Sequence, residues 1–421
     1  MDYITIHDGR LVIRKKARLF KGTMTERFDI LFEGMSEESS LKILCSEPEE
    51  LANPVDKYMA ATRLAACSSD ESLEGLIKAV DLDPGNLFNR ITRRKAIEAL
   101  GRRKNVKALD CLFKALEFDD EPSVINAADS IAQISAPLTE SQCHLLLKAL
   151  KGNDPQKRSV IQAHTRLGLK SGTSIIKTLI HVDNPLISGA ARAFCARVEG
   201  DFDQLKPLIP QLNDPQAGRR RSAVIDLGDS GDISTLDDLI KSAVSMPLRA
   251  KSAFQLVDPN KTAVVPEKYI KTMTTLLQDD PRNLCMRDEW LSSLDPTEIE
   301  KNLQHRDEGK QYGAALSLLA LPKSEQIKLI DGIHSRLWSD YGANYLLTSL
   351  IGLASIQERE ELIKTALAET LPQYAKSRVA AAWACLKLDL KDQCDLLEQI
   401  STDSQWIPLK WSCSRALQNF S

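Results

Sequence analysis

A self-similar unit of about 32 residues runs along most of this chain, and a period of that length is typical of stacked helix pairs. The clearest copy places the small-residue run Thr92–Gly101 before the leucine-rich run Val106–Leu116. Alanine and glycine let one helix of each pair approach its neighbour closely, while leucines on the other helix fill the remaining space. The repeat therefore predicts an all-α solenoid of helix pairs.

Further copies extend this pattern along the chain. We expect a small-residue helix at Asn283–Leu294, and leucine-rich helices at Thr173–His181, Leu205–Leu212 and Leu236–Ala243. The alternation is that of HEAT-type repeats, which stack into a right-handed superhelix.

The domain organisation follows from the repeat. A length of 421 residues suggests two or three globular domains, but a repeat stack grows in one dimension and can absorb the whole chain. We therefore expect a single solenoid over residues 23–421. Residues 1–22 form an N-terminal extension in which Ile4–Ile6 and Leu11–Ile13 flank an Asp-Gly turn, the pattern of a small β-hairpin.

Composition limits the function classes. The net charge of −3 argues against a dedicated nucleic-acid binder, and no stretch is long and apolar enough to span a bilayer. The nine cysteines are spread singly without C-x-x-C pairs, which favours reduced thiols over disulfides or a metal site. We expect a cytoplasmic protein with no metal, no nucleic-acid partner and no membrane span.

Three runs in this order resemble a known family. They are Tyr58–Leu64, Asn89–Gly101 and Arg219–Asp229, and together they are similar to the E/F-type phycobilin lyases of cyanobacteria, which are HEAT-repeat proteins. The resemblance covers residues 56–421 and is strongest up to Gly231. The pair Cys143-His144 does not match the Asn-His-Cys-Gln-Gly-Asn motif of the isomerases that form phycoviolobilin, so that motif is not carried over.

The resemblance implies an enzyme that attaches a linear tetrapyrrole to a cysteine of a phycobiliprotein. A single chain of this length looks most like the phycoerythrin-specific branch, with phycoerythrobilin as substrate, the phycoerythrin α subunit as protein partner, and isomerisation to phycourobilin as an accompanying activity of some members. The acceptor cysteine belongs to the partner, and no prosthetic group is implied. The chain itself must bind the two propionates, offer a carboxylate to the pyrrole nitrogens and supply a proton.

The aligned ends of the small-residue helices indicate which side chains look into the groove of the solenoid. These are Arg94, Arg221, Cys285, Tyr345 and Trp411. The two arginines are candidate partners for the propionates, because a guanidinium binds a carboxylate in bidentate geometry.

Asp226 occupies the slot that Ala99 fills in the clearest repeat, where side chains pack against the neighbouring helix. A carboxylate there must be paired or functional. We leave two readings open with equal weight: an ion pair with Arg220 or Arg221, or a carboxylate for the pyrrole nitrogens.

Aromatic side chains gather in the last third of the chain. All five tryptophans and five of seven tyrosines follow residue 268, and a flat ring with a polar edge suits a conjugated tetrapyrrole. The best constellation joins Trp338, Asp340, Tyr341 and Tyr345, because Tyr341 and Tyr345 share a helix face. Asp340 is either the helix N-cap or an acid–base group.

A second candidate cluster lies earlier and is placed on a helix. It comprises Cys285, Arg287, Asp288 and Trp290, with Tyr312 on the following helix. Arg287 is the propionate partner of this cluster, and Cys285 is either a packing residue or a proton donor.

Two other function classes stay open. A non-catalytic HEAT scaffold or chaperone for phycobiliprotein subunits would use the same surface without forming a bond. A regulatory adaptor for helical peptides would instead have a groove lined by leucines.

Overall fold

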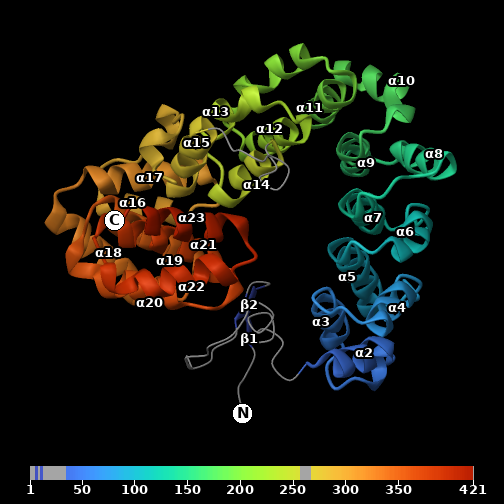
Figure 1. The fold of residues 1–421 in the computed structure, drawn as a ribbon, viewed down its shortest axis with the longest axis horizontal. Helices are drawn as coiled ribbons and strands as arrows, with labels where there is room; N and C mark the ends of the chain where they lie inside the picture. The colour runs from blue at the N-terminus through green and yellow to red at the C-terminus, as the bar shows by residue number, and fades with distance from the viewer. Residues whose placement is uncertain (1–4, 8–9, 13–34, 257–266, 421) are drawn as a thin grey trace.

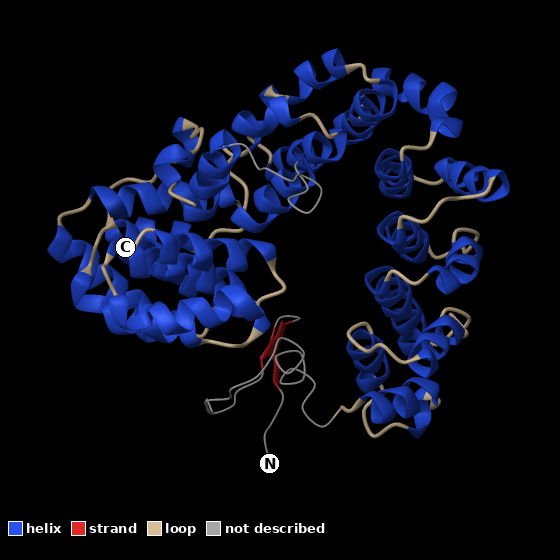
Figure 2. Cartoon of the chain, in the orientation of Figure 1, coloured by secondary structure: helices blue, strands red, loops and turns tan. Residues whose placement is uncertain are grey.

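The structure is a computed structural model that describes residues 5–7, 10–12, 35–256 and 267–420. Its helices stack side by side into a curved arch whose two arms face each other across an opening (Figure 1). Helices, short helical turns and loops form the described chain, apart from two strands near its N-terminus (Figure 2). The predicted all-α solenoid of helix pairs is confirmed.

The first arm has an inner and an outer row of helices (Figure 1). It begins with α2 (Glu37–Cys45). The inner row consists of the small-residue helices α3 (Val55–Leu64), α5 (Leu87–Arg103), α7 (Glu121–Ile134) and α9 (Asp154–Leu167). The outer row consists of α4 (Asp70–Ala79), α6 (Leu109–Ala115) and α8 (Glu140–Lys148).

The middle of the arch has regular inner helices and broken outer ones. The inner helices are α11 (Pro185–Phe194), α12 (Ala217–Ser230) and α14 (Met246–Leu256). The outer segments are α10 (Thr173–Ile176), the 3-10 turns Lys177–His181, Phe202–Leu208 and Pro210–Asn213, and α13 (Leu236–Leu239). The three leucine-rich helices predicted here are therefore shorter or more tightly wound than expected. Pro207, inside one of these turns, removes a backbone donor that a longer α-helix would need.

The second arm curls more tightly and closes on itself. Its helices are α15 (Glu267–Gln278), α16 (Pro296–Leu303), α17 (Glu308–Ala320), α18 (Lys323–Leu337), α19 (Tyr341–Leu353), α20 (Glu360–Ala368), α21 (Ala375–Lys387), α22 (Cys394–Asp403) and α23 (Ile407–Gln418). Both α21 and α23 contact α15, so the last repeats return to the first helix of this arm.

Glycines at the ends of inner helices explain why small residues recur with the repeat. Each packs on the next inner helix so closely that a Cβ in its place would lie 2.8 Å from a backbone Cα atom. The three contacts are Gly101 with Ser130, Gly228 with Ser252, and Gly352 with Ala384. A side chain at any of these positions would push neighbouring repeats apart.

The predicted helix at Asn283–Leu294 is wrong. The structure has only the 3-10 turns Pro281–Asn283 and Asp288–Trp290 there, joined by extended chain. This segment lies directly on α17, where a Cβ at Gly313 would clash with the carbonyl oxygen of Trp290. No space for a helix is left at that separation.

Two strands represent the N-terminal extension. β1 (Thr5–His7) pairs antiparallel with β2 (Arg10–Val12), with Ile6 opposite Leu11. The predicted turn at residues 8–9 lies outside the described residues, as does the predicted boundary between residues 22 and 23. Within the described chain, no helix combines the length and the apolar character needed to cross a membrane.

Candidate functional site

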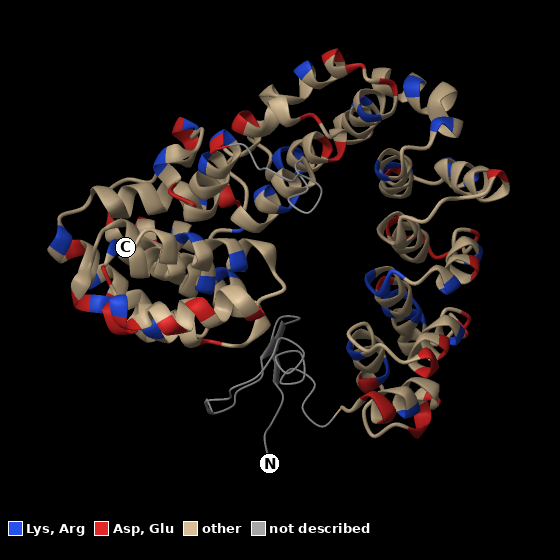
Figure 3. Ribbon diagram, in the orientation of Figure 1, with Lys and Arg blue, Asp and Glu red and all other residues tan. Residues whose placement is uncertain are grey.

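Charged side chains line the inner helices of the first arm and the middle of the arch. Lysines and arginines gather on α5, and both signs of charge occur on α12 (Figure 3). We call this set the inner polar strip. Its members are Glu98 and Arg102 on α5, Asn126, Asp129 and Gln133 on α7, Arg158 and Arg166 on α9, and Arg221, Asp226 and Asp229 on α12.

A polar cavity of about 250 Å³ lies within this strip between α5 and α7. Asn126 donates to Glu98 at 3.1 Å, and Gln133 donates to Asp129 at 2.6 Å. Arg102 is half exposed and lies 4.0 Å from Glu98, its nearest carboxylate. Ser130 completes the lining. The cavity thus presents a cation, two carboxylates and two carboxamides to solvent.

Arg166 ties three inner helices together next to this cavity. Its Nη1 lies 2.7 Å from Asp129 on α7, while Nε and Nη2 lie 2.9 and 3.0 Å from the two oxygens of Asp229 on α12. Asp229 is buried, but the Asp129 side chain remains 44% exposed. Asp129 is therefore a carboxylate held in place by Arg166 and Gln133 that still exposes part of its side chain to a ligand.

Asp226 is paired, but not with the partners that the sequence suggested. Arg158 on α9 binds both of its oxygens, with Nη2 at 2.7 Å and Nη1 at 3.1 Å. Arg220 and Arg221 bind other carboxylates. Burial raises the pKa of Asp226 to about 6, although Arg158 opposes the shift. Ion pairing between repeats is thus confirmed as a role for Asp226, and the partner is corrected to Arg158.

Two predicted propionate partners already hold carboxylates. Arg94 binds Asp120 with Nε and Nη2, and this hydrogen bonding lowers the pKa of Asp120 to about 2. Arg221 binds Glu308 with Nε at 3.0 Å and Nη2 at 2.7 Å. Arg221 remains 42% exposed and Arg94 is 30% exposed. Their predicted role in bilin binding stays a prediction, and it requires them to accept a second anion or exchange the first.

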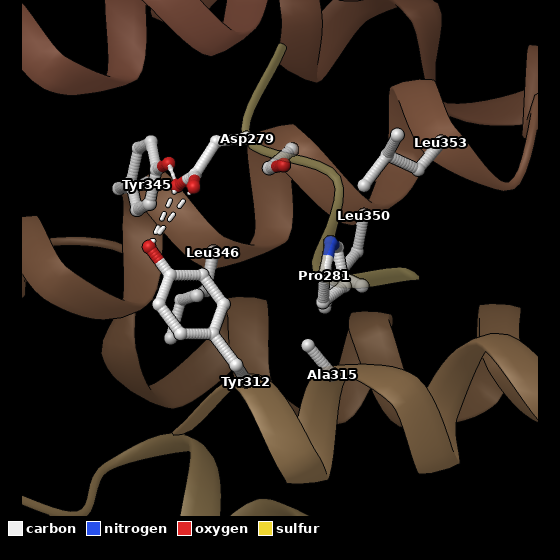
Figure 4. A pocket seen from close by; sticks show the side chains of 9 residues that line it. Asp279, Pro281, Tyr312, Ala315, Tyr345, Leu346, Leu350 and Leu353 are labelled. Carbon is white, nitrogen blue, oxygen red and sulfur yellow. Dashed lines mark hydrogen bonds between the residues drawn. The ribbon is translucent and has the colours of Figure 1, made fainter. Parts of the chain in front are cut away.

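A buried acid–phenol cluster lies in the second arm. Asp279 follows the last turn of α15 with a left-handed backbone (φ 50°) and is 5% exposed. It accepts hydrogen bonds from the phenols of Tyr312 and Tyr345 (Figure 4). It also accepts one from Arg249. Lys376 on α21 places Nζ 3.7 Å above the ring of Tyr345. We call these five residues the Asp279 cluster.

Burial governs the acid–base properties of this cluster. Desolvation and the nearby Asp279 carboxylate raise the pKa of both Tyr312 and Tyr345 well above the ordinary value. Desolvation lowers the pKa of Lys376 to about 8. The cavity beside Asp279, Tyr312 and Tyr345 is only about 10 Å³, enough for one water molecule. The two phenols therefore do not line a space that holds a tetrapyrrole in this structure, and their predicted bilin contact stays a prediction.

Sequence reasoning found the two tyrosines but missed Asp279, Arg249 and Lys376. The signal was present: Arg249, Tyr312, Tyr345 and Lys376 stand in the first turns of inner helices, and the last three follow one another at intervals of one repeat. Asp279 lies in a loop, where the helical periodicity gives no indication of where a side chain points.

Asp340 is the N-cap of α19, accepting hydrogen bonds from the backbone of Gly342 and Ala343 at 2.9 Å each. Tyr341 is 53% exposed, whereas Tyr345 is 1% exposed, so the two phenols that the spacing places on one helix face differ in their access to solvent. Tyr341 is the first residue of α19. Trp338 packs against His334 with ring centroids 4.7 Å apart.

The structure brings part of the second predicted cluster together, because Trp290 packs with Tyr312 and the Arg287 guanidinium lies 5.8 Å from the Trp290 ring centroid. Cys285 is exposed in the extended chain and Asp288 at the start of the following 3-10 turn, and Arg287 donates to the backbone carbonyl of Asn213 at 3.0 Å. Trp290 is buried, with the guanidinium of Arg220 4.3 Å from its ring centroid. Because this segment is not a helix, these side chains do not share a face. Their catalytic and bilin-binding roles stay predictions.

Trp411 lies on α23, the last helix of the second arm, where the chain returns to α15. Its ring packs edge-on against Phe254 and Tyr269, with centroids 6.1 and 6.5 Å away. Its indole nitrogen is buried without a hydrogen-bond partner among the described residues. Trp411 thus helps to close α23 onto α14 and α15, and its predicted bilin contact is untested.

Comparison with known proteins finds a repeat family and several proteins that are similar to this chain. Residues 86–165 match the family of HEAT repeats. The chain is 25% identical over 400 residues to the uncharacterized phycocyanin operon protein Y of Pseudanabaena tenuis, with 94% of each chain covered. It is 24% identical to the bilin biosynthesis protein CpeY of a Synechococcus species, covering 87% of this chain and 89% of that protein.

A solved structure has the same fold. The complex of CpcE and CpcF of phycocyanin lyase from a Nostoc species matches with a TM-score of 0.50 and 20% identity, covering 57% of this chain and 94% of the matched chain. The repeat match, the shared fold and the similarity along nearly the whole sequence agree with the resemblance read from the three runs. The chain is therefore similar, along nearly its whole length, to HEAT-repeat proteins of the E/F-type phycobilin lyase kind.

Proposed function

We propose that this protein is a phycobilin lyase that attaches phycoerythrobilin, through a thioether, to a cysteine of a phycoerythrin subunit. The observation that carries the proposal is similarity to the bilin biosynthesis protein CpeY over 87% of this chain. The phycoerythrin α subunit is the acceptor in this proposal, and isomerisation to phycourobilin is a second activity of the same site.

The reaction adds a thiol across a carbon–carbon double bond. The acceptor sulfur bonds to the ethylidene group of ring A, the π bond breaks, and the ring carbon that becomes saturated receives a proton. The thiol gives its own proton to solvent, so no oxidant or reductant is needed. The enzyme must therefore position a flexible dianion, exclude wrong conformers and supply one proton.

The inner polar strip has the chemistry for positioning. Arg102 can bind a propionate because it is half exposed and only weakly paired. The open carboxylate of Asp129 can accept from pyrrole nitrogens, and the carboxamides of Asn126 and Gln133 complement a terminal lactam ring. A cavity of about 250 Å³ suits one or two rings, and the rest of the pigment would extend along the strip.

This polar lining supports the lyase over a peptide adaptor, which would need a groove of leucines. A lyase differs in its covalent product from a scaffold that binds pigment or subunit without forming a bond.

The test is reconstitution with purified components. Phycoerythrobilin is mixed with the protein and each apo-phycoerythrin subunit in turn, and the product is denatured in acid urea. A lyase leaves pigment covalently attached to one subunit. The attachment is also faster than in a mixture of pigment and subunit without the protein. An absorption band at shorter wavelength after denaturation reports phycourobilin. Pigment that separates entirely from every subunit on denaturation would exclude the lyase and favour the scaffold.

A further inference from the structure

Lys376 is an unusual cation in this structure. It lies in the first turn of α21, partly covered by neighbouring helices, with Nζ over the ring of Tyr345 rather than against an acid. Among the described residues, Asp279 and Glu308 act on Lys376 only through their charge and form no ion pair with its Nζ. A half-buried ammonium that is held by a ring face loses part of its hydration without a counter-charge nearby.

The groups around Lys376 come from four elements. Asp279 follows α15, Glu308 and Tyr312 belong to α17, Arg249 to α14 and Tyr345 to α19. Glu308 is bound by Arg221. Asp279 accepts hydrogen bonds from Arg249 and from the two phenols. Every carboxylate that faces Lys376 is therefore already engaged, so the ammonium is left available to a ligand.

Lys376 also stands at the meeting point of the two polar regions. Glu308, whose charge acts on Lys376, is the residue that Arg221 binds at the end of the inner polar strip. Behind Lys376, Tyr345 donates to Asp279, which also accepts a hydrogen bond from Tyr312. Lys376 is partly exposed as a residue, whereas Tyr312 and Tyr345 are buried, so the lysine is the more accessible of the three at the Glu308 end of the strip.

From this arrangement we propose that Lys376 is the proton donor of the ligation reaction, held in place by Tyr345 and Asp279. This inference rests on the proposed lyase function and names a catalytic residue for it. The Lys376 ammonium gives its proton to the ring-A carbon as the thioether forms, and solvent then returns a proton to the neutral amine. The acceptor thiol loses its proton to solvent, so atoms and charge balance.

The lowered pKa of Lys376, about 8, suits this role because a donor works best near the operating pH. Three variants separate the donor role from a structural one. Lys376→Met removes the proton, Lys376→Arg keeps the positive charge but holds its proton at alkaline pH, and Lys251→Met removes an exposed lysine of α14 as a control.

The rate of covalent attachment is measured from pH 6 to 10 for each variant with the same acceptor subunit. We expect Lys376→Met to lose about 100-fold in rate, and Lys251→Met to match the wild type. The ratio of the wild-type rate to the Lys376→Arg rate should fall above pH 8, since only the wild-type donor deprotonates there. Taking this ratio cancels the ionisation of the acceptor cysteine.

A second measurement needs no activity. Competitive acetylation of the wild-type protein at increasing pH, read by mass spectrometry, gives the titration of each lysine. Lys376 should become reactive around pH 8, well before a lysine of ordinary pKa, about 10.4.

The outcomes separate the two proposals. A wild-type protein that attaches pigment while the rate ratio stays constant with pH would overturn the donor role alone. Acetylation of Lys376 in step with Lys251 would overturn it as well. Absence of any covalent pigment from the wild type would overturn the lyase, and the donor role with it.

Discussion

The carboxylate of Asp226 on α12 is bound by both terminal nitrogens of Arg158 on α9, 68 residues earlier in the chain. Helix α11 lies between these two helices and contacts both. Gly189 of α11 makes room for the pair, because a Cβ there would lie 2.6 Å from an Asp226 oxygen. The ion pair therefore joins repeats that are not neighbours, which a simple stack does not do.

Arg158→Met is expected to destabilise the fold. It leaves the Asp226 carboxylate, 2% exposed, without its partner, and loss of one member of a buried pair costs about 3–5 kcal/mol. Urea unfolding followed by circular dichroism measures the loss. The double variant Arg158→Met, Asp226→Leu removes both charges and should recover most of it. A double variant as unstable as the single one would show that the pair is not the cause.

The raised pKa of Asp226 should make the stability of the fold depend on pH. Its folded pKa of about 6 lies above the value of an unfolded aspartate, about 3.9, so the folded state binds more protons between these values. The stability contributed by this group is therefore highest below pH 4 and falls as the pH rises to 6. Comparing melting temperatures at pH 4.5 and pH 7 measures this. In Asp226→Asn the same rise in pH should lower stability less, and an identical pH response in both proteins would contradict the assignment.

Tight contact between α17 and the segment before it can be tested with two glycines. Gly313→Ala places a methyl group against the carbonyl of Trp290 and should cost about 1–3 kcal/mol. Gly218→Ala, on α12, meets no atom within 4 Å and should leave stability unchanged or raise it by up to about 1 kcal/mol. Thermal melts of the two variants measure the difference. Equal melting temperatures would mean that the segment can move away from α17 at no cost.

The fold was largely predictable because the repeat carries its own packing rule. The A-L-G ends predict close contact between inner helices, and Gly101 on Ser130 has that contact. The helix expected after residue 282 was wrong, since the decisive feature is how closely Trp290 approaches α17. That distance depends on tertiary packing, which periodicity does not encode.

The candidate site was less predictable. A carboxylate at position 226 could be identified as needing a partner, but Arg158 was not identifiable, because the pair depends on the bend of the stack at α11. Asp279 lies in a loop, so its inward direction follows from its backbone conformation and not from a helical pattern. In both cases the residue type indicated that a carboxylate needs partners. Which side chains lie next to it depends on the path of the superhelix.

Arg102 provides a test of pigment binding with little effect on the fold. Arg102→Ala removes a half-exposed cation whose nearest acid is 4.0 Å away, and such surface pairs are worth at most about 1 kcal/mol. If it binds a propionate, its loss should raise the KM for phycoerythrobilin about tenfold. Arg336→Ala is the matched control, with a similar exposure of 55% and one ion pair to Glu300. Equal KM values for both variants would remove Arg102 from the pigment site.

The start of α19 can be tested with variants that separate capping from chemistry. Asp340→Ala loses the N-cap and should cost about 1 kcal/mol, whereas Asp340→Asn keeps an oxygen for the cap. Tyr341→Phe removes an exposed phenol and should not change stability. If these residues act on the pigment, Asp340→Asn and Tyr341→Phe both lower chromophore transfer while the circular dichroism spectrum stays the same. Full product yield in both would take this helix end out of the reaction.

Asp279 receives donors from α14, the last inner helix in the middle of the arch, and from α17 and α19 of the second arm. In an ordinary solenoid the terminal repeats fray one after another, since each depends only on the repeat beside it. Here no single turn can detach without leaving a desolvated charge behind. The second arm should consequently resist limited proteolysis as one block, protected up to the point at which all of its turns open together.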